Sequence, residues 1–305
     1  MEARGNMMEN YYHLFANGDD AKNFITNEDE FRAAMNRVAV CSHLCHVKVV
    51  VATIEDSHPH FLLKGTLEEV NRFAEKYTDL TTRYISRHRG SIDGVALNLE
   101  ICPISDEAYL RNAAAYIIVQ PTKDGKAILP HDYLYGTGAL YFRQKGSILP
   151  WDHDYNGHLH EKVELGTLPI RDQWRICNTK EPMPSDWIIS GGFIHPACYV
   201  DVESLENIYK THNCYRAFTA SSKSQDEIIR STMASIRGII LDDIEARRIC
   251  AEQCLRLFSK HSTKTLTMTQ RLNLAQELRR SYRMSFRQLS TMVKIPELEL
   301  RKYIR

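Results

Sequence analysis

The hydrophobic pattern of residues 1–145 alternates between a period of about two residues and one of about 3.6, which indicate strands and helices respectively. The strand-like segments are short and rich in β-branched or aromatic residues, and the helical ones open on acidic or capping residues. Strands are predicted at Tyr11–Ala16, Val47–Ile54, His58–Leu63 and Val95–Ile101, and helices at Glu28–Cys45, Thr66–Ser86 and Asp106–Val119. Proline lacks a backbone N–H, so we expect Pro121 to stop the last helix.

The order of these elements is β-α-β-β-α-β-α. Only the polar residues Glu55-Asp56-Ser57 separate the second predicted strand from the third, so these two strands should form a hairpin. Thr66 followed by Glu69 is the pattern of a helix capping box. Interleaved helices and one hairpin predict an α+β fold with helices on one face of the sheet.

The remaining sequence divides into two regions. Residues 146–200 are rich in Trp, Pro, Gly and His without clear periodicity, and we interpret them as an irregular connector with some strand. Residues 201–305 are helical in pattern almost to the end. Three helices joined by very short turns are predicted at Thr267–Tyr282, Ser285–Val293 and Glu297–Ile304. We therefore expect domain boundaries near residues 145 and 200.

Composition changes this picture at one place only. Hydrophobic residues make up 43% and charged residues 25% of the 305, as in an ordinary globular protein, and the net charge is +1. From Lys264 to Arg305, however, ten Lys or Arg stand against three Asp or Glu. This end of the chain is strongly basic.

The eight cysteines include no C-x-x-C pair. Cys41/Cys45 and Cys250/Cys254 have i,i+4 spacing in helical segments, which favours buried free thiols over a zinc site. No apolar run has the length of a signal peptide or a membrane span. We expect a cytoplasmic protein with reduced thiols and no membrane contact.

The first candidate for chemistry is the pair His58 and His60. Residues i and i+2 of a strand point to the same face, so both imidazoles can approach one divalent cation. Chance pairs of this kind are frequent in a chain with 13 histidines, and His158 and His160 form a second one. The second pair lies in a charged, glycine-containing segment and is better explained as part of a surface loop.

The second candidate is Tyr116 with Gln120, four residues apart on one face of a predicted helix. The Gln120 carbonyl can complete a His-His-amide set that suits Mg²⁺ or Mn²⁺, beside which a Tyr hydroxyl can attack a phosphodiester. Taken alone, the two residues are better explained as a core aromatic and a polar residue at a helix end.

Together these features resemble a known family, the HUH transposases with a single catalytic tyrosine, which include IS200-like and REP-associated tyrosine transposases. The resemblance rests on the opening segment YYHLFANGD, the hairpin VVVATIEDSHPHFLL and Tyr116-Ile117-Ile118-Val119-Gln120-Pro121. A Tyr- and Gly-rich stretch, HDYLYGTGALYF, follows. The resemblance to this family is close over about residues 10–145 and loose over the rest of the chain.

The resemblance implies a ferredoxin-like antiparallel sheet, the HUH endonuclease fold. It implies that His58, His60 and Gln120 bind Mg²⁺ or Mn²⁺ and that Tyr116 is the nucleophile. The family cleaves and rejoins hairpin-associated single-stranded DNA through a 5′-phosphotyrosine, as a monomer or a homodimer. The sequence departs from the family pattern at two positions that bear on activity: Pro59 stands between the histidines, where we expect it to distort the strand, and Ser57 replaces the usual Asn.

The basic C-terminal residues 267–305 have the spacing of a helix-turn-helix. Positive side chains on it would meet DNA phosphates. The candidate nucleic-acid-binding residues are Arg279, Arg280, Arg283, Arg287, Lys294, Arg301 and Lys302. A solvated basic tail packed on the first domain is the alternative.

Three functions from different classes follow. The first is a metal-dependent DNA nicking and joining enzyme, a transposase. The second is a domesticated, catalytically weak or silent DNA-binding regulator on the same fold, which Pro59 and Ser57 favour. The third is an unrelated metal enzyme or a zinc protein organised by the cysteines.

Overall fold

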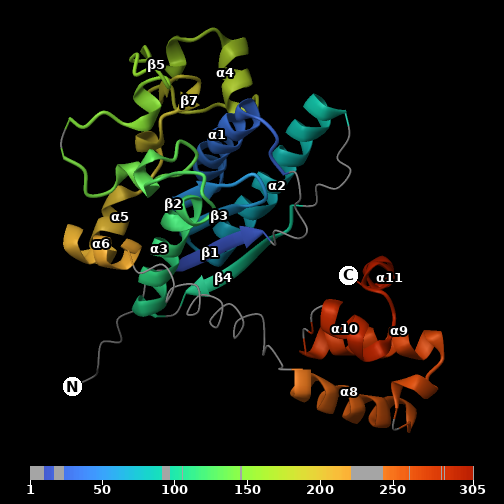
Figure 1. The fold of residues 1–305 in the computed structure, drawn as a ribbon. Helices are drawn as coiled ribbons and strands as arrows, with labels where there is room; N and C mark the ends of the chain where they lie inside the picture. The colour runs from blue at the N-terminus through green and yellow to red at the C-terminus, as the bar shows by residue number, and fades with distance from the viewer. Residues whose placement is uncertain are drawn as a thin grey trace, which may run out of the picture. The chain divides into compact units, whose positions relative to one another are not determined.

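A computed structural model describes residues 10–16, 24–90, 97–104, 106–144, 146–220, 243–260, 262–282, 284 and 286–304, without the side chains of 243–246, 280–282 and 287. Its chain forms two compact units, Met1–Ile229 (unit 1) and Arg230–Arg305 (unit 2) (Figure 1). The first part of unit 1 contains β1 (Tyr11–Ala16), α1 (Glu28–Cys45), β2 (Lys48–Ile54), β3 (Pro59–Lys64), α2 (Leu67–Arg89), β4 (Leu99–Ile104) and α3 (Glu107–Lys123).

The central sheet of unit 1 has the strand order β2-β3-β1-β4, and every neighbouring pair is antiparallel. This order, with α1 after β1 and α2 after β3, is the ferredoxin-like arrangement, so the predicted α+β fold is confirmed. The predicted hairpin is β2 and β3, and β1 separates β3 from β4. The first residues of the strand predicted at Val95–Ile101 lie outside the described residues.

Helices α1 and α2 cover one face of this sheet. The Asn27 side chain caps α1 by accepting from the Glu30 N–H, and Thr66 and Glu69 form the predicted capping box at α2. From β3, Phe61 packs between Phe73 and Tyr77 of α2, with ring centroids 5.5 and 5.0 Å away. The expectation of helices on one face therefore holds for the ferredoxin-like part.

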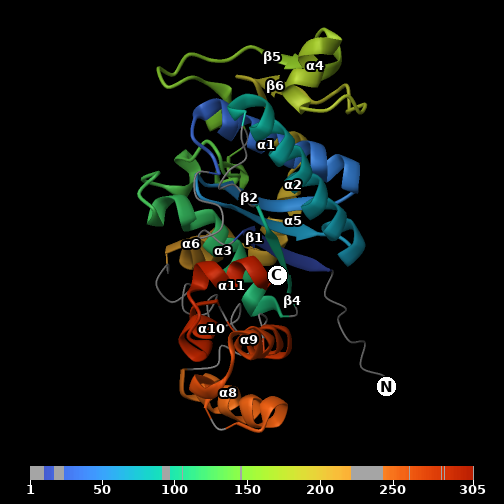
Figure 2. The ribbon, with the colours of Figure 1, turned by 90° about the vertical axis from the view of Figure 1, so that its right-hand side faces the viewer.

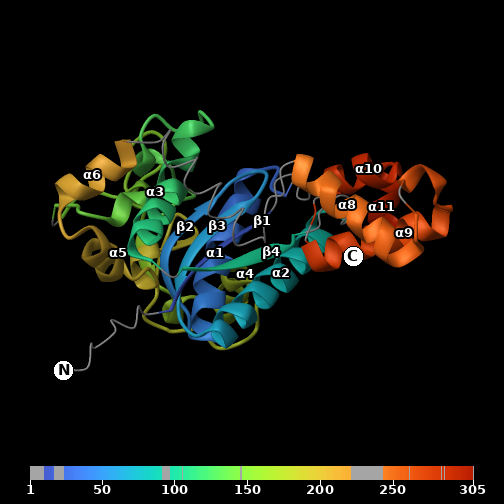
Figure 3. The same cartoon turned by 90° about the horizontal axis from the view of Figure 1, so that it is seen from below.

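Helix α3 lies on the opposite face, which corrects that expectation for the chain as a whole (Figure 3). Side chains alternate along a strand, so His60 points away from the face of Phe61. The His60 ring meets the Tyr116 ring of α3, with centroids 5.5 Å apart. Both faces of the sheet carry apolar side chains that must be buried. The pair α1 and α2 buries only one face, so α3 packs on the other.

The prediction that Pro121 stops α3 is wrong: the helix contains Pro121 and ends at Lys123. A proline at this position leaves the Ile117 carbonyl without its usual helical N–H donor. The Thr53 hydroxyl of β2 donates to that carbonyl at 2.9 Å and is itself buried. A hydrogen bond from the sheet thus replaces the missing one within the helix.

Residues 146–200 are more ordered than the predicted irregular connector. They contain β5 (Lys162–Glu164), α4 (Ile170–Cys177), β6 (Ile188–Ser190) and β7 (Phe193–Ile194), and the strands form a second antiparallel sheet. Figure 2 shows β5, β6 and α4 gathered at one end of unit 1, beyond α1. The buried amide of Asn36 in α1 joins the two parts: it accepts from the Ile194 N–H and donates to the Gly192 carbonyl.

The domain boundary expected near residue 200 also differs from the observed one. Helices α5 (Val202–Tyr209) and α6 (His212–Ala220) belong to unit 1 and pack on α3. The Tyr209 hydroxyl donates to the Arg111 carbonyl at 2.6 Å, and the Arg111 guanidinium donates to the Ile208 carbonyl at 3.1 Å. These helices therefore cover the outer side of the helix that carries Tyr116.

The described part of unit 2 is helical. It consists of α8 (Asp243–Phe258), α9 (Met268–Tyr282), α10 (Phe286–Val293) and α11 (Glu297–Tyr303), close to the three predicted C-terminal helices. Its own core includes Leu274, Leu278, Leu289 and Leu300, and Cys250 and Cys254 are buried there as free thiols. Across the described residues of both units, no helix is both long and apolar enough to cross a membrane.

Candidate metal and nucleophile site

The two predicted metal-binding histidines lie together at the start of β3. Their ring centroids are 4.6 Å apart, and His60 is 2% exposed. Pro59 is the first residue of β3, a position that tolerates a missing N–H, and it pairs in register with Ile54. The expected distortion is absent there; the irregularity of this ladder lies at Val49 and Val51.

Ser57 contacts the first of these imidazoles. Its hydroxyl lies 2.7 Å from Nδ1 of His58. In the tautomer whose Nδ1 proton is donated to Ser57, the Nε2 lone pair of His58 is available to a cation. Ser57, which stands where Asn is usual, can therefore orient the His58 ring.

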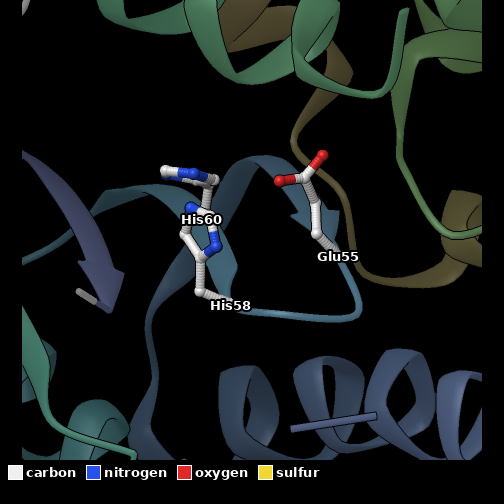
Figure 4. A group of neighbouring side chains, drawn as sticks. All are labelled: Glu55, His58 and His60. Atoms are coloured by element: carbon white, nitrogen blue, oxygen red, sulfur yellow. The ribbon is translucent and has the colours of Figure 1, made fainter. Parts of the chain in front are cut away.

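Glu55 joins the histidines, although the sequence analysis did not select it. One potential ligand atom each from Glu55, His58 and His60 lies within 4.8 Å of the others (Figure 4). Glu55 is fully buried, and neither carboxylate oxygen accepts a hydrogen bond from the described residues. Its nearest described cation is the Lys126 ammonium, 3.7 Å from Oε1. The sequence signal was an acidic residue directly after a buried strand, across a tight turn from the histidine pair.

Helix α3 brings the predicted nucleophile to the same face. Tyr116 is half-buried, and its ring meets His60 edge-on at 86°. Gln120 follows one turn later on the same side of the helix, and its Oε1 is buried without a hydrogen-bond partner among the described residues. The Lys123 ammonium lies 4.8 Å from the centroid of the Tyr116 ring.

His13 is a second residue that sequence reasoning missed. It points from β1 to the face of His60 and is fully buried, with ring centroids 5.8 Å from His60 and 6.2 Å from Tyr116. Neither ring nitrogen has a hydrogen-bond partner among the described residues. The only signal was a histidine within an aromatic strand; its nearness to His60 comes from the pairing of β1 with β3.

Burial controls the protonation of this cluster. It lowers the pKa of His13 to about 3 and the pKa of His60 well below its ordinary value, and it lowers that of His58 too. Burial also raises the pKa of Glu55 to about 7, against the opposing charge of Lys126. The histidines are therefore neutral, which is the form that binds metals.

The donors fit a divalent cation. Buried polar atoms almost always find partners, yet the nitrogens of His60, the oxygens of Glu55 and Oε1 of Gln120 have no hydrogen bond among the described residues. Two imidazoles with carboxylate or amide oxygens form a mixed nitrogen and oxygen set, which suits Mn²⁺ and related ions. A cation would also compensate the buried charge of Glu55.

The predicted nucleic-acid-binding residues lie in unit 2, apart from this cluster in the sequence. The side chains of Arg280, Arg283 and Arg287 lie outside the described residues. Arg279 and Arg301 each place a guanidinium carbon 4.7 Å from the Phe286 ring centroid, so both contribute to packing. Lys294 follows α10 in a left-handed conformation, with φ of 57°, and Lys302 is exposed on α11.

The fold and this site together define an α+β protein with a buried His/His/Glu cluster facing a tyrosine. No protein-family model matches the sequence, and no curated protein sequence matches it. Among solved structures, similarity is found to a REP-associated tyrosine transposase bound to a REP hairpin: TM-score 0.32, 10% identity, 45% of this chain and 82% of the other. A "putative transposase" from Deinococcus radiodurans R1 matches with TM-score 0.26 and 12% identity over 41% of this chain and 97% of the other.

Proposed function

We propose that this protein is a metal-dependent enzyme that nicks and rejoins single-stranded DNA, with Tyr116 as the nucleophile. The observation that carries the proposal is the contact between the Tyr116 and His60 rings beside Glu55 and His58, since the potential ligand atoms of Glu55, His58 and His60 lie within 4.8 Å of one another. The DNA would be single-stranded, hairpin-associated and of the kind that transposases process. The resemblance of the sequence motifs to HUH transposases supports the same reaction.

Each side chain has a part in this reaction. His58, His60 and Glu55, with Gln120 as a further candidate, would hold Mn²⁺ or Mg²⁺, which when bound polarises the scissile phosphate and stabilises charge on its oxygens. The Tyr116 oxygen loses its proton to solvent and forms a bond to phosphorus. The bond from phosphorus to the 3′ oxygen breaks, and that oxygen takes up a proton to become a 3′-OH. In the rejoining step a 3′-OH loses its proton and attacks the phosphorus of the phosphotyrosine; the bond from phosphorus to the Tyr116 oxygen breaks, and that oxygen takes up a proton.

The test is covalent capture of DNA. We expect the purified protein, incubated with a labelled single-stranded hairpin oligonucleotide and Mn²⁺, to yield a protein–DNA adduct that survives denaturing electrophoresis. Tyr116→Phe removes the attacking oxygen and should abolish the adduct, as should EDTA. Tyr109→Phe is the matched control, because Tyr109 is on the same helix and its hydroxyl contacts Cys102, 3.3 Å away. An adduct of undiminished yield with Tyr116→Phe would show that another residue is the nucleophile.

The alternative is a catalytically silent DNA-binding regulator; against it stand the place of Pro59 at the start of β3 and the contact of Ser57 with His58. Specific hairpin binding without an adduct in Mn²⁺, Mg²⁺ and Zn²⁺ would nevertheless favour it. The choice between monomer and homodimer stays a prediction, as does a cytoplasmic location.

A further inference from the structure

Helices α9, α10 and α11 of unit 2 pack around one core (Figure 1). Helix α10 ends at Val293 and α11 begins at Glu297, so only residues 294–296 separate them. Ile295 in this turn is 1% exposed and belongs to the same core as Leu300 of α11. Two helices joined by so short a turn are the helix-turn-helix arrangement, which places its second helix in the major groove of DNA. Helix α11 is therefore the candidate for contact with bases.

The outward face of α11 carries an apolar side chain that the protein leaves uncovered. Leu300 is the buried residue of this helix. At about 100° per residue, Leu298 and Lys302 are about 160° around the helix axis from Leu300. Leu298 is 78% exposed, so it contributes little to the core of unit 2. An apolar side chain on a helix in the major groove contacts the C5-methyl group of thymine.

Positive charge borders this face. Lys294 is in the turn, Lys302 is on α11 and Lys264 is in the segment before α9, and all three are exposed. The Thr263 hydroxyl donates to the Met292 carbonyl at 3.1 Å, which holds Lys264 near the end of α10 from which the turn departs. None of the three ammonium groups forms an ion pair with a described residue. They are available to the phosphates on either side of a groove.

The acidic side chains of α11 do not cancel this charge. Glu297 pairs with Arg301 of the same helix, with Oε1 2.8 Å from the guanidinium, and that guanidinium lies over the Phe286 ring of α10. Glu299 is exposed and has no ion pair among the residues that the structure describes. Its carboxylate can accept from the amino group of cytosine, which is a base contact. Three lysines against this one carboxylate leave the face positive.

We infer that α11 reads bases of double-stranded DNA through the major groove, with Leu298 against the methyl group of a thymine. Lys264, Lys294 and Lys302 contact the phosphates and Leu298 supplies the preference for sequence, because cytosine lacks the methyl group. The inference rests on the predicted DNA binding of the C-terminal region and is independent of cleavage by Tyr116. It adds recognition of a duplex sequence to the proposed reaction on a single strand.

The preferred sequence is found by selection. Full-length Tyr116→Phe in EDTA keeps both units and cannot cleave, and it is offered blunt duplexes with a randomised centre. We expect enrichment of a common sequence that contains thymine. Replacing the contacted thymine by deoxyuridine removes only the methyl group and should weaken binding about fourfold, the contribution of one buried methyl group. Selection without any common sequence would overturn the inference.

Variants then assign the contact to its residue. Leu298→Ala should bind the selected duplex and its deoxyuridine form alike. Leu257→Ala on α8, a leucine 42% exposed, is the matched control and should keep the fourfold difference. Lys294→Gln should weaken binding of both duplexes equally and lower the slope of affinity against salt by about one. Circular dichroism checks that each variant is folded.

Two results would contradict this assignment. The inference is overturned if Leu298→Ala still distinguishes thymine from deoxyuridine as the parent does, or if the parent binds one strand of the selected sequence more tightly than the duplex. Failure of the proposed nicking function has a different signature: the chain with Tyr116 intact would form no adduct with hairpin DNA and Mn²⁺, while Leu298 would still determine duplex preference.

Discussion

At the residue scale, the two candidate oxygen ligands differ in charge. Glu55 belongs to the compact group with His58 and His60, whereas Gln120 is on α3, one turn after Tyr116, and carries a neutral amide. A carboxylate attracts a divalent cation far more strongly than an amide dipole does at the same distance.

We therefore predict that Glu55→Gln weakens Mn²⁺ binding at least about tenfold, the range seen when a metal site loses a supporting group. Gln120→Ala should have a smaller effect. Isothermal titration of the metal into the full chain measures both, with the exposed Glu68→Gln on α2 as control. If Glu55→Gln binds Mn²⁺ with the affinity of the parent and Gln120→Ala does not, Gln120 and not Glu55 is the third ligand.

Lys123 is the cation closest to the proposed nucleophile that the structure describes, 4.8 Å from the Tyr116 ring centroid. Positive charge there stabilises the negative charge that the Tyr116 oxygen carries once it has lost its proton and before it bonds to phosphorus. Lys123→Met should slow single-turnover adduct formation about tenfold, which corresponds to about 1.4 kcal/mol of activation free energy. Lys123→Arg should keep most of the rate. If Lys123→Met and Lys123→Arg slow adduct formation equally, the lower rate comes from the changed side-chain shape and not from the lost positive charge.

At the element scale, one hydrogen bond joins α3 to the sheet at the carbonyl that Pro121 leaves open. Thr53 donates to the Ile117 carbonyl that Pro121 leaves open, one residue after the nucleophile. Thr53→Val keeps the branched shape and removes the donor, so the buried carbonyl is left unpaired. We expect a loss of about 1–3 kcal/mol in the free energy of unfolding, measured in urea.

A double-mutant cycle separates this bond from general packing. In Pro121→Ala the new N–H can donate to the Ile117 carbonyl, so Thr53→Val should cost less in that background. Equal losses in the two backgrounds would mean that the Thr53 hydroxyl contributes nothing specific to the helix.

At the scale of the whole molecule, the two units have separate cores. Unit 2 buries its own apolar residues, among them Leu274 and Leu289, and the Glu55 cluster lies wholly in unit 1. We predict that residues 1–229 expressed alone fold and still form the DNA adduct. Their affinity for a hairpin with a duplex stem should fall, because the basic segment from Lys264 onward is missing.

Circular dichroism, adduct yield and anisotropy check these three expectations. The complementary fragment 230–305 should bind duplex DNA with strong salt dependence, and Lys302→Gln should reduce that dependence. A folded fragment 230–305 that does not bind duplex DNA at low salt would refute the prediction of a C-terminal DNA-binding region.

Local patterns in the sequence determined most of the elements of unit 1. The bounds of β1 and α1 agree with the prediction, because the spacing of their apolar side chains and the cap at Asn27 depend on a few neighbouring residues. The capping box at Thr66 was predictable for the same reason. The pairing of His58 with His60 was equally predictable, since alternation along one strand places both rings together.

Tertiary structure alone decided what surrounds that pair. Glu55 reaches the histidines across the turn of the β2–β3 hairpin and His13 through the pairing of β1 with β3, and α3 continues past Pro121 because a hydroxyl distant in sequence replaces the lost donor. Likewise, Arg279 and Arg301 are basic in sequence but pack on Phe286. Periodicity and capping act within one segment, whereas the burial and partners of a polar atom depend on segments that only folding brings together.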